Sequence, residues 1–183
     1  MQLSIFKREK KQINNLRLLN NVPAVLYAKG IQNENIYLKK DELKKTFATI
    51  KPGELPTTIF TLKSEKETFK AVVKDISYFV TTYEVQHIDF MKLDEKLKIS
   101  INVPVRSIGM AESKGVKLGG NFRQVMRSIK VKCLPKDLPK EFVIDVSQMD
   151  VGELKRLGDI SMPKGVDHVN KNMQEVIISI SKR

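Results

Sequence analysis

A histidine and an aspartate stand two residues apart in the segment 85–91, which reads VQHIDFM. In a β-strand successive side chains point to opposite faces, so Ile88 and Phe90 would share one face, and His87 and Asp89 the other. If the apolar pair faces a core, the polar pair is exposed and can bond a 2′-hydroxyl, a phosphate or a base edge of RNA. An ordinary solvated strand face would show the same pattern, so the pair alone does not decide.

The first 30 residues are the most basic part of the chain, and they hold further candidates for RNA contact. Arg8, Lys10, Lys11 and Arg17 supply positive charge suited to phosphate binding. Tyr27 follows an apolar stretch, where its ring can stack on a base or its hydroxyl can bond a ribose. Each residue also has a plainer interpretation, because lysine runs are often solvated and a tyrosine at a strand end is often a core residue with its hydroxyl at the surface.

The sequence lacks the motifs of the common nucleotide and metal sites. It contains no phosphate-binding loop, no G-x-G-x-x-G and no H-E-x-x-H, and we interpret Gly115 with the pair Gly119-Gly120 as hairpin turns. Two histidines and one cysteine are too few for a four-ligand structural zinc site. An enzyme would depend on His87 acting with Asp89 in a pocket, so we expect no catalysis, no cofactor, no metal and no small-molecule substrate.

The composition is that of a folded, strongly basic protein. Of its 183 residues, 41% are hydrophobic, and 33 Lys and Arg exceed 21 Asp and Glu to give a net charge of +12. This charge favours a polyanion, either nucleic acid or an anionic membrane surface, and it is shared by both halves of the chain. The sequence contains no apolar run of transmembrane length and begins with a charged segment, so we expect a cytoplasmic protein.

Hydrophobic periodicity predicts a mainly β fold with a few helices. Short amphipathic helices are expected at 13–20 and around Leu43, Phe47 and Ile50. In the first half, strands are expected at 22–28, 36–38, 58–62, 69–76 and 84–91. After about residue 93 alternation dominates, with Cys133 part of a strand, and further strands are expected at 99–105, 125–133, 142–146 and 176–180. The change of pattern predicts a domain boundary at 92–95, between a domain 1–93 and a mainly β domain 94–183.

Motifs in both halves combine into a family resemblance. Those of the first half are Lys7-Arg8-Glu9, Leu16-Arg17, Val22-Pro23-Ala24-Val25-Leu26-Tyr27 and His87-Ile88-Asp89-Phe90. In order and spacing they resemble the N-terminal domain of the bacterial 5S-rRNA-binding family of large-subunit ribosomal proteins. The second half resembles the extra domain of the long form of that family, the type of the general stress protein Ctc, through Val103-Pro104-Val105, Gly115-Val116-Lys117 and Cys133-Leu134-Pro135.

This resemblance implies a structural protein of the large subunit, bound to the ribosome, that helps to organise the central protuberance. Its first domain would be a small β-barrel with accessory helices, similar to an anticodon-binding barrel, that binds 5S rRNA at internal loop E, largely through the minor groove. Neighbouring large-subunit components would be its other partners. Arg8, Arg17, Tyr27, His87 and Asp89 fall on the positions of the family's RNA-recognition cluster.

The chain departs from the family at Lys11-Gln12, Arg17-Leu18 and Ala28, which predicts that some phosphate contacts are lost or moved to Lys10 or Lys11. The loop 77–83 carries Tyr78-Phe79-Val80 in place of polar residues, so it either contacts RNA differently or covers the barrel. Two other functions stay open. The barrel could bind tRNA, as the anticodon-binding barrel of glutaminyl-tRNA synthetase does. The chain could also be a stress-related RNA- or ribosome-associated protein whose second domain binds a protein partner.

Overall fold

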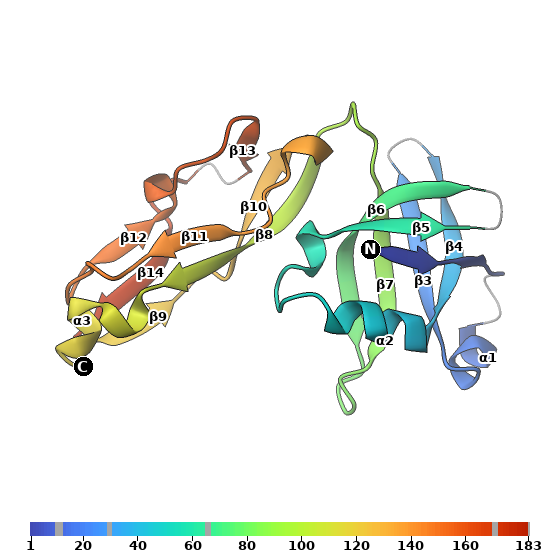
Figure 1. Ribbon diagram of the computed structural model, residues 1–183, viewed down its shortest axis with the longest axis horizontal. Coiled ribbons are helices and arrows are strands. Elements are labelled where there is room, and N and C mark those ends of the chain that lie inside the picture. Colours follow the sequence, from blue (N-terminus) through green and yellow to red (C-terminus); the bar gives the residue numbers. More distant parts are fainter. Residues whose placement is uncertain (10–12, 29–30, 65–66, 170–171, 183) are drawn as a thin grey trace. The chain divides into compact units, whose positions relative to one another are not determined.

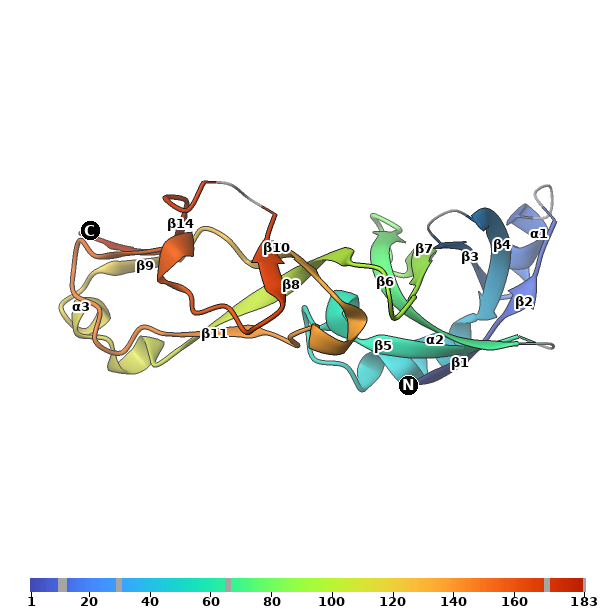
Figure 2. The same cartoon turned by 90° about the horizontal axis from the view of Figure 1, so that it is seen from above.

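A β-barrel forms from the first half of the chain in the computed structural model, which describes all residues except 10–12, 29–30, 65–66, 170–171 and 183 (Figures 1 and 2). The chain divides into two units, Met1–Leu97 and Lys98–Arg183. The barrel strands are β1 (Gln2–Ser4), β2 (Phe6–Lys7), β3 (Asn21–Ala28), β4 (Ile31–Lys39), β5 (Ile59–Lys63), β6 (Thr68–Tyr78) and β7 (Val85–Lys92).

The first residues of the chain nearly close this sheet on itself. The strand order is β1-β5-β6-β7-β3-β4-β2, so β1 and β2 lie at its two edges. Only Ile5 separates these two strands in sequence, and its N–H donates to the carbonyl oxygen of Lys63 (2.9 Å) on the β5 side. Because one short segment pairs with β5 and then with β4, it leaves little free edge in the sheet.

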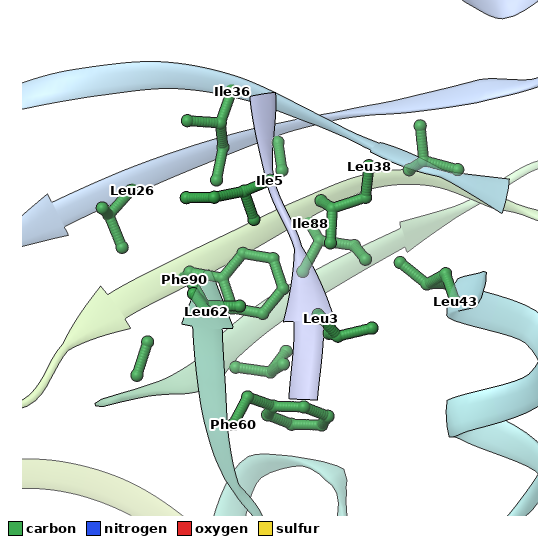
Figure 3. Packing of buried hydrophobic residues seen from close by; sticks show 14 residues of the cluster. Leu3, Ile5, Leu26, Ile36, Leu38, Leu43, Phe60, Leu62, Ile88 and Phe90 are labelled. Carbon is green, nitrogen blue, oxygen red and sulfur yellow. The ribbon is translucent and has the colours of Figure 1, made fainter. Parts of the chain in front are cut away.

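Alternation along the strands builds the barrel core, which Figure 3 shows from close by. Ala24 and Leu26 of β3 and Ile88 and Phe90 of β7 are buried, as the alternation of segment 85–91 predicts. Aromatic rings fill the centre, where Phe60 meets Phe90 edge to face with ring centroids 6.2 Å apart. The buried cluster comprises Leu3, Ile5, Val22, Ala24, Leu26, Ile36, Leu38, Leu43, Phe60, Leu62, Ala71, Val73, Ile88 and Phe90.

Two α-helices accompany the barrel in the described part of the chain. Helix α1 (Ile13–Leu18) buries Leu16, and it ends two residues earlier than predicted because Asn20 takes a left-handed conformation with φ 55°. Helix α2 (Lys40–Ala48) buries Leu43 and carries Asp41 and Glu42 in its first turn, where carboxylates favour the helix dipole. A short 3-10 turn, η2 (Leu55–Thr57), precedes β5.

The described residues of the second unit form two sheets. Its strands are β8 (Ile99–Ile108), β9 (Asn121–Gln124), β10 (Ser128–Cys133), β11 (Phe142–Asp145), β12 (Leu154–Arg156), β13 (Val166–His168) and β14 (Val176–Ser181). The sheets have the orders β11-β8-β10-β13 and β12-β14-β9. The short turns are η3 (Met110–Glu112), α3 (Lys114–Lys117), η4 (Pro135–Asp137) and η5 (Leu157–Asp159). The predicted mainly β architecture, with a small N-terminal barrel and accessory helices, is confirmed.

The interpretation of the glycine cluster as hairpin turns is wrong, because these residues form α3 and its C-terminal end. Gly119 has φ 85°, and the N–H of Gly120 donates back to the carbonyl oxygen of Gly115 (2.9 Å). A Cβ on Gly115 would lie 2.8 Å from the carbonyl carbon of Asp150, and one on Gly120 would lie 2.7 Å from the carbonyl oxygen of Gly115. The glycines therefore permit a close approach of backbones.

Candidate nucleic-acid interface

The outer face of the barrel carries the predicted His87 and Asp89 on β7. Strand β7 lies between β3, which runs parallel to it, and β6, which runs antiparallel. Asp89 is opposite Val25 on β3 and Asp75 on β6, and Val25 is in turn opposite Asn35 on β4. Residues in register share a face, so this row of outward side chains crosses four strands.

His87 and Asp89 bond to each other on this face. The Nδ1 of His87 lies 2.9 Å from Oδ1 of Asp89, and the side chains are 31% and 39% exposed. The sequence predicted exposure of the pair, which is partial in the structure. The contact between Nδ1 and Oδ1 leaves Nε2 of His87 and Oδ2 of Asp89 outside it.

Tyr27 stands at the end of β3 beside this pair. Partial burial, together with the negative charges of Asp89 and Asp75, raises the pKa of Tyr27 to about 12. Its hydroxyl is therefore protonated at neutral pH and is a hydrogen-bond donor. The ring is also engaged, since Nζ of Lys74 lies 5.3 Å from its centroid.

Lys74 and Asp75 also belong to this face, although neither was predicted as a contact residue. The register of β6 against β7 shifts between Val73 and Asp75, so Lys74 is the extra residue of a β-bulge. Asp75 accepts the backbone N–H of Ile76 through Oδ1 (2.9 Å). The break in apolar alternation after Val73 is the sequence signal that could have indicated a bulge.

Arg8 follows β2 and is held against β4. Its Nε–H donates to the carbonyl oxygen of Ile36 (3.0 Å), and its backbone N–H donates to the backbone carbonyl oxygen of Asn35 (3.0 Å). Burial lowers the pKa of Arg8, although a guanidinium keeps its charge in proteins. Because Asn35 is in the row that contains Asp89, Arg8 lies at the end of that row.

Arg17 lies at a different place, beside the hairpin between β6 and β7. Its guanidinium carbon is 5.8 Å from the ring centroid of Phe79, and no contact described by the structure joins it to His87 or Asp89. Since Ser77 pairs with His87 just before this hairpin, Arg17 is near the end of the same two strands. Lys10 and Lys11 lie outside the described residues.

The hairpin projects from the barrel and does not cover it, as Figure 1 shows. Val80 is 89% and Tyr83 is 81% exposed. Glu84 anchors the hairpin to α2, because its carboxylate accepts Nζ of Lys40 (2.7 Å) and of Lys44 (3.0 Å). These two hydrogen bonds lower the pKa of Glu84.

Two other kinds of site were considered for the described residues, a metal site and a membrane-spanning helix. In the parts of the chain that the structure describes, no group of three His, Cys, Asp or Glu side chains could hold a metal ion. None of the helices described here is both long and apolar enough to cross a membrane. His87 stands on a strand face, which suits a surface contact with a large partner.

Comparisons with known proteins agree with the two units. The ribosomal L25p family matches residues 3–90, and the C-terminal domain of ribosomal protein TL5 matches residues 98–183. The chain is 39% identical over 186 residues to the large ribosomal subunit protein bL25 of Chlamydia trachomatis serovar L2, with all of both chains covered. The bL25 proteins of Chlamydia pneumoniae and Chlamydia abortus are 37% and 36% identical, also over the full length of both chains. The chain therefore belongs to the bL25 family of bacterial large-subunit ribosomal proteins, in the long form with a TL5-type C-terminal domain.

Proposed function

We propose that the outer face of β3, β7 and β6 binds 5S rRNA at internal loop E, with Arg8, Arg17, Tyr27, His87 and Asp89 as contact residues. The chain is a ribosomal protein and not an enzyme, so the ribosome and its rRNA are its partners. The loop E site rests on the family resemblance and on the chemistry of this face. A structural role in the central protuberance follows from that site.

The observation that carries the proposal is the cluster of Tyr27, His87 and Asp89, in which each side chain keeps a polar atom for a ligand. Tyr27 has a protonated hydroxyl, His87 has Nε2 free of the bond to Asp89, and Asp89 has Oδ2. Together they can accept and donate hydrogen bonds with ribose hydroxyls and base edges. The wide minor groove of an RNA helix displays those groups.

The two carboxylates also bear on which RNA shape this face accepts. Asp75 and Asp89 are opposite each other across β6 and β7. These two negative carboxylates repel phosphates, but they can accept hydrogen bonds from 2′-hydroxyls and from amino groups of bases. A regular backbone pressed onto this face would be disfavoured, and an irregular loop that presents donors would be favoured.

Positive residues around the carboxylates supply the attraction to RNA. Arg8 lies at the end of the row, Lys74 lies over Tyr27, and Arg17 lies at the hairpin. Lys10 and Lys11 add charge to the same N-terminal segment. Phosphate contacts of this kind position the protein without reading sequence, so affinity and selectivity depend on different residues.

Footprinting of the full chain on 5S rRNA tests the proposal, with tRNA as the competitor. Protection of backbone positions in and beside loop E, unaffected by excess tRNA, is the expected result. Protection spread evenly over the RNA, or removal of the chain by tRNA at an equal concentration, would contradict it. The second result would favour a tRNA-binding barrel. A footprint that is absent while the chain still joins the large subunit would favour attachment through another ribosomal component.

A further inference from the structure

A second polar surface lies on the sheet β11-β8-β10-β13 of the second unit. Strands β8 and β10 are antiparallel, with Lys130 opposite Asn102 and Lys132 opposite Ser100. The alternate residues Ile101 and Val131 are buried, so Lys130 and Asn102 point to the other face. Beyond β10, Lys132 is opposite Asp167 of β13. On β8 and β10, one face is thus apolar and the other is polar and basic.

Lys130 and Lys132, in the middle of this face, have no ion-pair partner among the described residues, whereas the charged residues at its sides form ion pairs. Nζ of Lys98 lies 2.9 Å from Asp167, and Nε of Arg106 lies 3.2 Å from Glu141. The bond from Lys98, with a smaller effect of the charge of Lys132, lowers the pKa of Asp167. Within the described residues, no ion pair engages Lys130 or Lys132 directly. Two cations therefore remain at the centre of the sheet.

The spacing and chemistry of this face fit a nucleic-acid backbone. Lys130 and Lys132 are two residues apart on one strand, so their Cα atoms are separated by roughly 6.8 Å. That is comparable with the distance between successive phosphates of an RNA strand. The exposed neutral side chains Asn102 and Ser128 lie beside them and can bond phosphate or ribose oxygens.

A protein partner fits the same face less well. Protein–protein interfaces are enriched in aromatic residues and methionine and depleted in lysine and serine, whereas nucleic-acid interfaces are more polar and positive. The outward residues in register on this sheet include no aromatic side chain and no methionine among those described. They are Ser100, whose hydroxyl is buried, Asn102, Pro104, Arg106, Ser128, Lys130, Lys132 and Asp167, with the exposed Val143 of β11 beside Arg106.

We propose that this face of β8 and β10 binds phosphates of ribosomal RNA outside 5S rRNA, with Lys130 and Lys132 as the central contacts. The proposal goes beyond loop E recognition and does not depend on it, because the residues belong to the other unit. Lysine contacts to phosphate are independent of base sequence, so this surface adds affinity and orientation to the second unit.

The test compares two full-length variants that lose the same charge. Lys130→Gln/Lys132→Gln alters the sheet face, and the control Lys114→Gln/Lys117→Gln removes two exposed lysines from α3 in the same unit. The probe is deproteinised large rRNA of the large subunit without 5S rRNA, titrated at several salt concentrations. Thermal unfolding of both variants shows whether each still folds, and Lys130→Arg/Lys132→Arg provides a charge-preserving variant.

The expected result is a salt dependence that is shallower by about 1.4 to 1.8 in log–log slope for the sheet variant, the value of two lost phosphate contacts. The arginine variant should keep the slope of the unmodified chain, and the α3 variant should change it less than the sheet variant does. Equal changes in the sheet and α3 variants would overturn the proposal, because any two lysines would then serve. The sheet variant could also bind free rRNA normally but fail to bind large subunits from which this protein has been removed. That result would overturn the proposal in favour of an acidic protein partner.

Binding of a loop E fragment by the same variants separates this proposal from the first. If the barrel alone reads loop E, Lys130→Gln/Lys132→Gln leaves that affinity unchanged. Asp89→Asn should have the opposite pattern, with weaker loop E recognition and unchanged binding to the large rRNA. A failure of either proposal is therefore visible without a failure of the other.

Discussion

Carboxylates are unexpected side chains on a surface proposed to meet RNA, and Asp75 and Asp89 are directly opposite each other on the barrel. These carboxylates weaken the attraction to phosphates but increase selectivity, because an ionised carboxylate only accepts hydrogen bonds and therefore favours RNA groups that donate them. Asp89 also holds His87 through the 2.9 Å contact with Nδ1. A change at Asp89 should thus affect discrimination between RNA shapes more than overall attraction.

Asp89→Asn and Lys74→Gln should have different effects on binding to loop E. Asparagine removes the charge at nearly the same size, so we expect a loss of about 1–3 kcal/mol in preference for loop E over a regular duplex, with little change in salt slope. Lys74→Gln should reduce the slope by roughly 0.7–0.9, one phosphate contact, and should spare the preference. Titrations with both RNAs at several salt concentrations measure both quantities, and equal slope changes would contradict the division of roles.

Tyr27 should titrate at unusually high pH. Its pKa is raised to about 12 by burial and then by Asp89 and Asp75, whereas tyrosine in the unfolded chain titrates near 10. The folded state holds the proton more tightly, so this group leaves the free energy of unfolding constant below about pH 10 and lowers it as pH rises toward 12.

The difference in tyrosinate absorbance between the unmodified chain and Tyr27→Phe isolates this titration from the other three tyrosines. Asp89→Asn should shift the Tyr27 transition to lower pH, because one of the two negative charges is removed. A Tyr27 transition near pH 10 in the unmodified chain would contradict the described environment.

Alternation within single strands was predictable, whereas the pairing of strands was not. The segment 85–91 correctly predicted that Ile88 and Phe90 face the core, and that His87 and Asp89 lie on the opposite, partly exposed face. The parallel neighbour β3 and the bulge that adds Lys74 and Asp75 arise from long-range pairing, which a single segment does not encode. Strand β4 extends over Ile31–Lys39, although only 36–38 was predicted, because backbone pairing with β3 holds a polar stretch without alternation.

The role of the glycines around α3 could not be predicted for the same reason, because the backbones and side chains that pack against them belong to residues far along the chain. Gly120→Ala would place a Cβ 2.7 Å from the carbonyl oxygen of Gly115 and 2.8 Å from Ile180. We expect the second unit to lose about 1–3 kcal/mol of stability, typical of an overpacked site.

Gly158→Ala is the matched control, because its Cβ would find its nearest neighbours at ordinary contact distances of 3.5 and 3.6 Å. Urea unfolding of both variants measures the difference. A stability of Gly120→Ala equal to that of the control would mean that the contact around α3 is looser than described.

The two units of this bL25-family protein carry surfaces of different chemistry. The barrel combines carboxylates, a tyrosine and a histidine on one face, whereas the sheet face of the second unit offers lysines and neutral polar groups. The net charge of +12 suits both surfaces to RNA and could not tell them apart. The resemblance of motifs predicted the family, and the described contacts suggest which residues read shape and which supply attraction.

The most direct test of the central claim is the affinity of the full chain for a 5S rRNA fragment containing loop E, compared with the same fragment after the loop is converted to a regular duplex. Measurements at several salt concentrations separate shape recognition from charge attraction. We expect tight binding to the loop that is lost on conversion, at every salt concentration. Equal binding to both fragments that disappears together as salt rises would contradict it.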